Sequence, residues 1–248
     1  MRSFKKTAFT LAEVLITLGI IGIVAAVTMP TLIQHHQKQV TVTKLKKVYS
    51  ELTQTLQKAE NEHGMMETWD FSGFETALDT GKYFGENYLF PYMKTIKICI
   101  PSSNECWADD VMALSNITEK ELVNTQKNHI SFTTASRYSV YYWVGKSGHS
   151  MAYYVDINGL KAPNKLGRDV FYFHTYWGNL NNSDNKLGVY PYGLQSKSVN
   201  YSRSAMLDGI GFLDGERACK KGNDYHNGGA CAAVIMLDGW KIEKDYPW

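Results

Sequence analysis

Apolar residues fill the first part of the chain and then continue at helical spacing. From Phe9 to Met29 almost every residue is apolar, and Glu13 is the only charged residue among them. A stretch of this length can cross a bilayer as a helix. Further along, apolar residues recur every three or four positions, at Leu45, Val48, Leu52, Leu56 and Ala59. This spacing predicts one apolar face on a helix that continues to His63.

The predicted helix has a clear end and one internal irregularity. Gly64 is a natural C-terminal stop, and no Gly or Pro interrupts residues 31–63. Pro30 lies inside the helical pattern and is expected to kink the helix or to melt one turn. The sequence therefore predicts one helix over residues 9–63, of which residues 9–29 form the transmembrane half.

The remaining residues, 64–248, predict an exported globular α+β head. Short helical pieces are expected at 74–78 and 88–93, and a capped helical turn at 116–122, with Thr118 at the cap and Glu121 three residues later. Strands rich in aromatic and β-branched residues are expected at 137–144, 150–156 and 169–174, the first two joined through 145–148.

A closing hairpin is expected near the C-terminus, because residues 232–237 and 240–242 flank Asp238-Gly239, a favoured hairpin turn. Together these strands predict an antiparallel sheet of about four strands. The sheet is expected to pack on the polar half of the long helix and to bury the stripe from Leu45 to Ala59.

The charges are nearly balanced, with a formal net charge of +2. Arg2, Lys5 and Lys6 form a basic leader within residues 1–8, and without them Asp and Glu outnumber Lys and Arg by one. No basic surplus then remains to attract nucleic acid. The same three positive charges predict that the N-terminus stays cytoplasmic and that the chain after Pro30 is exported.

The four cysteines lie in two pairs that are close in sequence, Cys99 with Cys106 and Cys219 with Cys231. An even number of cysteines in an exported chain favours disulfides, although four cysteines allow three connectivities. The two local pairs are the favoured connectivity. A zinc site is the alternative, but neither pair has the short gap that is typical of zinc ribbons.

A polar segment between two predicted strands carries side-chain oxygens of the kind that calcium prefers. These belong to Asp156, Asn158, Asn164 and Asp169. The segment is not an EF-hand, because Gly159 comes too early and no Glu closes the loop. Two interpretations stay open, a calcium site and a connection held by Asx turns.

No catalytic motif is present in the sequence. The seven histidines form no His-Glu-x-x-His set, and no Gly-x-Ser-x-Gly occurs. Gly145-Lys-Ser147 is similar to the end of a phosphate loop, but Val140 stands where that motif requires a glycine. The sequence thus predicts a protein that is not an enzyme, with a membrane-anchored extracytoplasmic hydrolase as a weaker alternative.

Two simple interpretations of the N-terminus are a secretory signal peptide, cut near residues 24–26, and an uncut signal anchor. Neither accounts for Glu13, because an isolated carboxylate in hydrocarbon costs roughly 2.5–3.5 kcal/mol and usually marks a function. Neither accounts for a helical pattern that continues in phase well beyond Pro30.

The run Lys5-Lys6-Thr-Ala8, followed by Phe9-Thr-Leu-Ala-Glu13-Val and the apolar residues after it, resembles the class III signal of type IV pilins and type II secretion pseudopilins. The resemblance implies that prepilin peptidase cuts between Ala8 and Phe9 and then N-methylates Phe9. Ala8 departs from the usual Gly before the cut, which puts the efficiency of processing in question. Pro30 stands where many members of the family carry a helix-breaking proline.

The resemblance also implies a role in assembly. The expected function is that of a structural subunit of a type II secretion pseudopilus or a type IV pilus, in which Glu13 pairs with the N-terminal amine of a neighbour. Pairing of Glu13 with the amine of its own chain is the alternative. The alternative function is a minor subunit at a fibre tip that acts as an adhesin or in DNA uptake.

The partners that the resemblance implies are other pilin or pseudopilin subunits, the peptidase-methyltransferase and an inner-membrane assembly platform. The expected location is the bacterial inner membrane, crossed once, and then a periplasmic or cell-surface fibre. No cofactor is expected, apart from calcium if the polar segment from Asp156 to Asp169 is a cation site.

Overall fold

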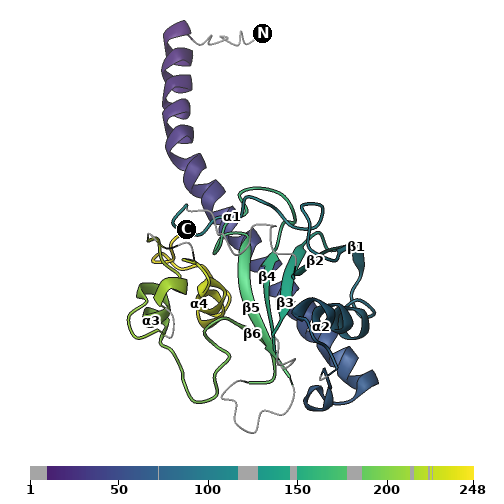
Figure 1. The fold of residues 1–248 in the computed structure, drawn as a ribbon. Coiled ribbons are helices and arrows are strands. Elements are labelled where there is room, and N and C mark those ends of the chain that lie inside the picture. Colours follow the sequence, from purple (N-terminus) through teal and green to yellow (C-terminus); the bar gives the residue numbers. More distant parts are fainter. Residues whose placement is uncertain are drawn as a thin grey trace, which may run out of the picture. The chain divides into compact units, whose positions relative to one another are not determined.

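The computed structural model describes residues 10–71, 73–116, 128–145, 150–177, 186–212, 215–222, 224 and 226–248. The chain divides into two compact units, Met1–Val40 and Thr41–Trp248. The fold is α+β and pilin-like, with a long N-terminal helix and an antiparallel sheet, as the sequence predicts (Figure 1). The predicted turn at Thr118 and Glu121 and the loop 146–149 lie outside the described residues.

The long helix α1 extends from Leu11 to His63. It continues through Pro30 without a break, so no turn melts there. The helix ends where predicted, because Gly64 adopts a left-handed conformation with φ of 84° that residues other than glycine disfavour. The Gly64 N–H donates a hydrogen bond to the Glu60 carbonyl at 2.9 Å and closes the last turn.

The predicted apolar stripe of α1 is buried, with each side chain at most 2 % exposed. Its members are Leu45, Val48, Leu52, Leu56 and Ala59. Beside the stripe, the ring of Tyr49 lies 6.4 Å from that of Phe173 in the sheet. This part of α1 is therefore a core element of the head, and its apolar spacing is explained by packing on the sheet.

The sheet has six strands in sequence order, and each pairs antiparallel with the next. The strands are β1 Thr95–Cys99, β2 Ile130–Thr134, β3 Ser139–Val144, β4 Ser150–Asp156, β5 Val170–Tyr176 and β6 Gly188–Pro191. The sequence predicted β3, β4 and β5, which are the long central strands. It missed β1, β2 and β6, which have only four or five residues each.

Both faces of the central sheet are covered. On one face, Tyr142 donates a hydrogen bond to the Gly81 carbonyl of helix α2 (Ala77–Phe84), and Tyr153 stacks on Phe173 beside α1. On the opposite face, Tyr154 stacks on Tyr172 at 4.3 Å, under residues of the C-terminal segment. A sheet buried on both faces explains why its strands read as nearly continuous aromatic and aliphatic runs.

The predicted closing hairpin is wrong, because residues 231–237 form helix α4 (Cys231–Leu237) next to helix α3 (Arg203–Asp208) (Figure 1). A short apolar run cannot be assigned to strand or helix by periodicity alone, and the alanines here favour helix. Every residue from Cys231 to Ile235 is buried. Gly239 and Trp240 both have positive φ and end the helix, so Asp238-Gly239 is a helix terminus.

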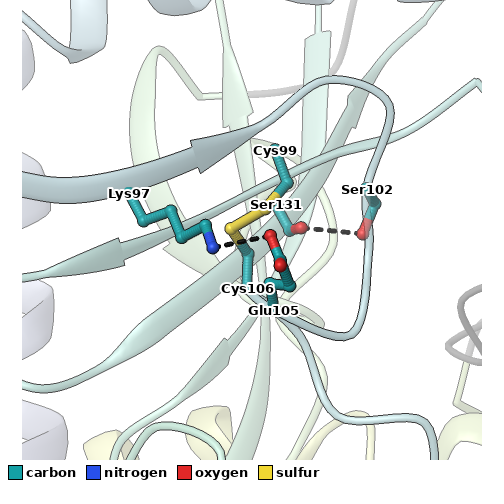
Figure 2. The surroundings of a disulfide bond; sticks show 6 residues. All are labelled: Lys97, Cys99, Ser102, Glu105, Cys106 and Ser131. Carbon is teal, nitrogen blue, oxygen red and sulfur yellow. Dashed lines mark hydrogen bonds and ion pairs between the residues drawn. A yellow bond between two sulfur atoms is a disulfide. The ribbon is translucent and has the colours of Figure 1, made fainter.

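Both disulfides join cysteines that are close in sequence, which is the favoured connectivity. Cys99–Cys106 pins a loop at the end of β1, beside an ion pair of 2.6 Å between Lys97 and Glu105 (Figure 2). Cys219–Cys231 is buried and fastens the start of α4 to the segment before it.

Candidate functional site: the apolar half of the long helix

The first unit is an apolar helix whose side chains are exposed. Every large aliphatic side chain of α1 before residue 34 is exposed, including Leu11 at 79 % and Val27 at 70 %. Among the described residues, α1 is the one helix long and apolar enough to cross a membrane. A core helix of a soluble protein would bury such a surface, whereas an exposed apolar surface of this length is typical of a helix that packs in a membrane or against other helices.

Glu13 and Thr10 form a capping box at the start of this helix. The Thr10 N–H donates to Glu13 Oε2 at 2.8 Å, and the Thr10 hydroxyl donates to the same oxygen at 2.9 Å. In return, the Glu13 N–H donates to Thr10 Oγ1 at 3.2 Å. These bonds pair backbone donors that have no partner within the helix.

Sequence reasoning missed this role of Thr10. The signal was present as Thr-x-x-Glu directly before an apolar run, which is the sequence signature of a capping box. Glu13 therefore has a local structural role in addition to the one that the resemblance implies. The two roles differ in what they require, because capping requires an oxygen acceptor whereas pairing with an amine requires a negative charge.

Small residues make part of the apolar helix surface flat. A Cβ atom added at Gly19 or at Gly22 would meet no atom within 4 Å. Glycines in a membrane helix let a second helix approach closely. The apolar unit thus combines bulky exposed side chains with open positions at which another helix can pack.

The other predicted site residues fall into three groups. Ala8 and Phe9, at the expected cleavage position, lie outside the described residues. Pro30 lies within the exposed part of α1. The four oxygen-bearing residues of the polar segment come together in the connection between β4 and β5, within the second unit.

The described residues contain no group of three His, Cys, Asp or Glu side chains placed to hold a metal ion. A histidine- or cysteine-rich metal centre of the kind that zinc hydrolases use therefore has no support in this part of the chain. Any cation site in the described residues must take most of its ligands from neutral oxygens.

His174, in the aromatic face of the sheet, is held neutral. Burial, together with a smaller contribution from the nearby positive charge of Arg217, lowers its pKa to about 3. Its Nδ1 lies 2.9 Å from the Tyr176 hydroxyl, whereas its Nε2 is buried and has no hydrogen-bond partner among the described residues. This environment suits a structural imidazole, since a protonated ring would leave a buried charge without an anion.

This burial predicts a loss of stability in mild acid. Below pH 6.5 the unfolded chain protonates His174 and the folded protein does not, so the free energy of unfolding falls as pH falls from 6.5 toward 3. Between pH 7.5 and 5.5 we expect wild type to lose about 1 kcal/mol more than His174→Gln, as measured by urea unfolding. Equal losses in the two proteins would show that the ring is protonated in the fold.

Comparison with known proteins supports the N-terminal interpretation. Residues 3–29 match the prokaryotic N-terminal methylation motif, the signature of type IV pilins and pseudopilins. Together with the long helix and the antiparallel sheet, this match identifies the protein as pilin-like. Proteins of this class are typically structural and membrane-anchored. Residues 31–248 match the profile of a family of unknown function (DUF6613), and the chain belongs to this family. No curated protein and no solved structure matches the chain.

Proposed function

We propose that the protein is a fibre subunit of the pseudopilus or pilus type, cleaved between Ala8 and Phe9, N-methylated at Phe9 and assembled by packing of the apolar half of α1. The observation that carries the proposal is the continuity of α1 from Leu11 to His63. Its exposed apolar residues and its buried stripe belong to one helix. Removal of the apolar part as an ordinary signal peptide would cut through a structural element.

Glu13 has the assembly role in this proposal. Cleavage before Phe9 creates an amine four residues from the Glu13 carboxylate. In a fibre, the carboxylate of one subunit and the amine of its neighbour would each supply the counter-charge that the other lacks in an apolar environment. Assembly partners of this kind are other subunits of the same family, delivered by the peptidase and an inner-membrane platform.

Mass spectrometry of the N-terminal peptide tests the proposal. The full-length gene is expressed in cells that contain a prepilin peptidase, and the protein is extracted from membranes with detergent. We expect the peptide to begin at Phe9 and to carry one additional methyl group. A protein that begins at Met1, or one that begins near Val27, would overturn the proposal.

Two controls define the source of the processed terminus. Cells that lack the peptidase should yield only the full-length chain. Ala8→Gly restores the residue that is usual before the cut, and we expect it to raise the processed fraction or to leave it complete. A fall in the processed fraction of Ala8→Gly would place the cut elsewhere.

A further inference from the structure

The connection between β4 and β5 brings two buried carboxylates together. Asp156 is the last residue of β4 and is 1 % exposed, and Asp169 directly precedes β5 and is 5 % exposed. Burial and the neighbouring Asp169 raise the pKa of Asp156 well above its usual range. Lys44, an exposed residue of α1, only partly offsets this effect. Two negative charges that lie close together in a buried site are stable only if a bound cation or a proton neutralises them.

Three buried oxygen atoms beside these carboxylates have no hydrogen-bond partner among the described residues: Ser139 Oγ, Asn158 Oδ1 and Asn164 Oδ1. Ser139 is 0 % and Asn164 2 % exposed, so water from the surface does not satisfy these two side chains. Asn158 is half-buried, but its Oδ1 atom is itself buried. Buried polar atoms without partners are rare in native proteins and need an explanation such as a bound ion or water.

The positions of these oxygens place them around the same carboxylates. Ser139 is directly opposite Asp156 in the pairing of β3 with β4, so both side chains are on one face of the sheet. Asn158 Nδ2 donates to Asp169 Oδ2 at 3.2 Å, which brings the Oδ1 of the same amide close to that carboxylate. The Asn164 N–H donates to Asp169 Oδ2 at 3.0 Å.

The orientation of the Asn158 and Asn164 side-chain amides leaves their oxygen atoms free to bind a cation. Asn164 Nδ2 donates to Asp110 Oδ1 at 2.6 Å, and turning the amide over would set two acceptors against each other. The same argument holds for Asn158 and Asp169. The Lys165 ammonium donates to Asn116 Oδ1, and it acts on Asp169 only through a smaller electrostatic interaction.

We infer that this group of carboxylate, amide and hydroxyl oxygens binds one calcium ion. The ligands come from Asp156, Asp169, Asn158, Asn164 and Ser139. Calcium accepts six to eight oxygen ligands in irregular geometry, including carboxylates and amide carbonyls, whereas magnesium requires a near-octahedral set and retains its water. The absence of histidine and cysteine from this set argues against zinc.

The connection that holds the ion is tied to three other parts of the head. The Thr41 hydroxyl of α1 donates to the Arg168 carbonyl at 3.3 Å, and Met112 N–H donates to the Asn164 carbonyl at 2.8 Å. Near the C-terminus, the Tyr246 hydroxyl donates to the Gly167 carbonyl. An ion bound here would therefore stabilise the packing of the whole head against its helix, independently of any role in fibre assembly.

Thermal unfolding of the full-length protein in non-ionic detergent, followed by tryptophan fluorescence, tests the inference. After removal of divalent ions with EDTA, we expect 10 mM calcium to raise Tm by roughly 5–10 °C, as for a site of about 0.1 mM affinity. Magnesium at the same ionic strength should have little effect. No shift with calcium, or an equal shift with magnesium, would overturn the inference and favour a buried water or proton.

Variants separate a metal ligand from a residue needed only for folding. Asp156→Asn retains the oxygen that accepts the Asn158 N–H but removes one charge. We expect it to unfold at the same or a higher temperature than wild type in EDTA and to lose the calcium shift. Asp208→Asn, on an exposed residue of α3, is the matched control and should keep the full shift.

Calorimetric titration of the metal-free wild type with calcium supplies a measurement that needs no variant. We expect one ion per chain, with the same titration for Asp208→Asn and no binding to Asp156→Asn. A calcium shift that persists in Asp156→Asn, or a titration without binding in wild type, would overturn the assignment.

Discussion

Glu13→Ala is expected to be processed normally but to appear in purified fibres at less than about a tenth of the wild-type amount. In the proposed fibre the variant leaves the Phe9 amine of a neighbour without a counter-charge. An unpaired charge at membrane depth costs roughly 2.5–3.5 kcal/mol, and each 1.4 kcal/mol is a tenfold change in an equilibrium. The measurement is the ratio of subunit in sheared fibres to subunit in membranes, determined by immunoblot.

Because Glu13 also caps its own helix, a variant that keeps the capping oxygen but loses the charge separates the two roles. Glu13→Gln keeps an oxygen that can accept from the Thr10 N–H, but it carries no charge. We expect Glu13→Gln to be as defective as Glu13→Ala if Glu13 pairs with an amine. Wild-type assembly of Glu13→Gln beside a defective Glu13→Ala would instead assign Glu13 to the capping of its own helix.

Thr10→Val is the matched control for the capping role. It removes the hydroxyl that bonds to Glu13 and leaves the charge in place. Loss of a cap costs about 1 kcal/mol of helix stability, so we expect a smaller defect than that of either Glu13 variant. A defect as large as that of Glu13→Ala would contradict a separate role for the charge.

Leu52→Ala is expected to lower the free energy of unfolding of the head by about 3 kcal/mol. Leu52 lies in the centre of the buried stripe of α1 and is 2 % exposed. Truncation of a buried leucine removes its apolar contacts and leaves a cavity, at a typical cost of about 2–5 kcal/mol. For a head of this size the loss corresponds to a fall in Tm of about 5–10 °C, measured by tryptophan fluorescence in detergent.

Lys46→Ala, on the exposed side of the same helix, is the control and should change stability by less than about 0.5 kcal/mol. Membrane insertion of Leu52→Ala should be unchanged, because the apolar half of α1 is intact. Equal stability of Leu52→Ala and Lys46→Ala would mean that α1 is not a core element of the head. Reduced insertion of Leu52→Ala would mean that the two halves of the helix do not act separately.

The long helix could be predicted from the sequence because its signals are local. The spacing of Leu45, Val48, Leu52, Leu56 and Ala59, together with the stop at Gly64, specifies both a buried face and an end. The central strands were predicted for the same reason, since each is a run of aromatic and β-branched residues. The Thr10–Glu13 pair was readable as well, although its signature was missed.

The short elements could not be predicted because their conformation depends on partners far away in the sequence. Strand β6 has four residues and exists through its pairing with β5, and β1 exists through its pairing with β2. Residues 232–237 have an apolar composition that suits either strand or helix. In the second unit this segment packs as helix α4, with Cys231 to Ile235 buried, which periodicity within seven residues cannot reveal.

The candidate cation site, too, could be predicted only in part from the sequence. Composition identified Asp156, Asn158, Asn164 and Asp169 as oxygen-bearing residues, but the sequence favoured a connection held by Asx turns and left a metal site only as the alternative. The fold pairs Ser139 with Asp156 across two strands and buries amide oxygens without partners. The N-terminal methylation motif and the long helix were thus already evident in the sequence, because a short motif and helix periodicity are local in the chain. Only the tertiary structure shows the buried oxygens gathered in one place, because burial and pairing are properties of residues that are distant in the chain.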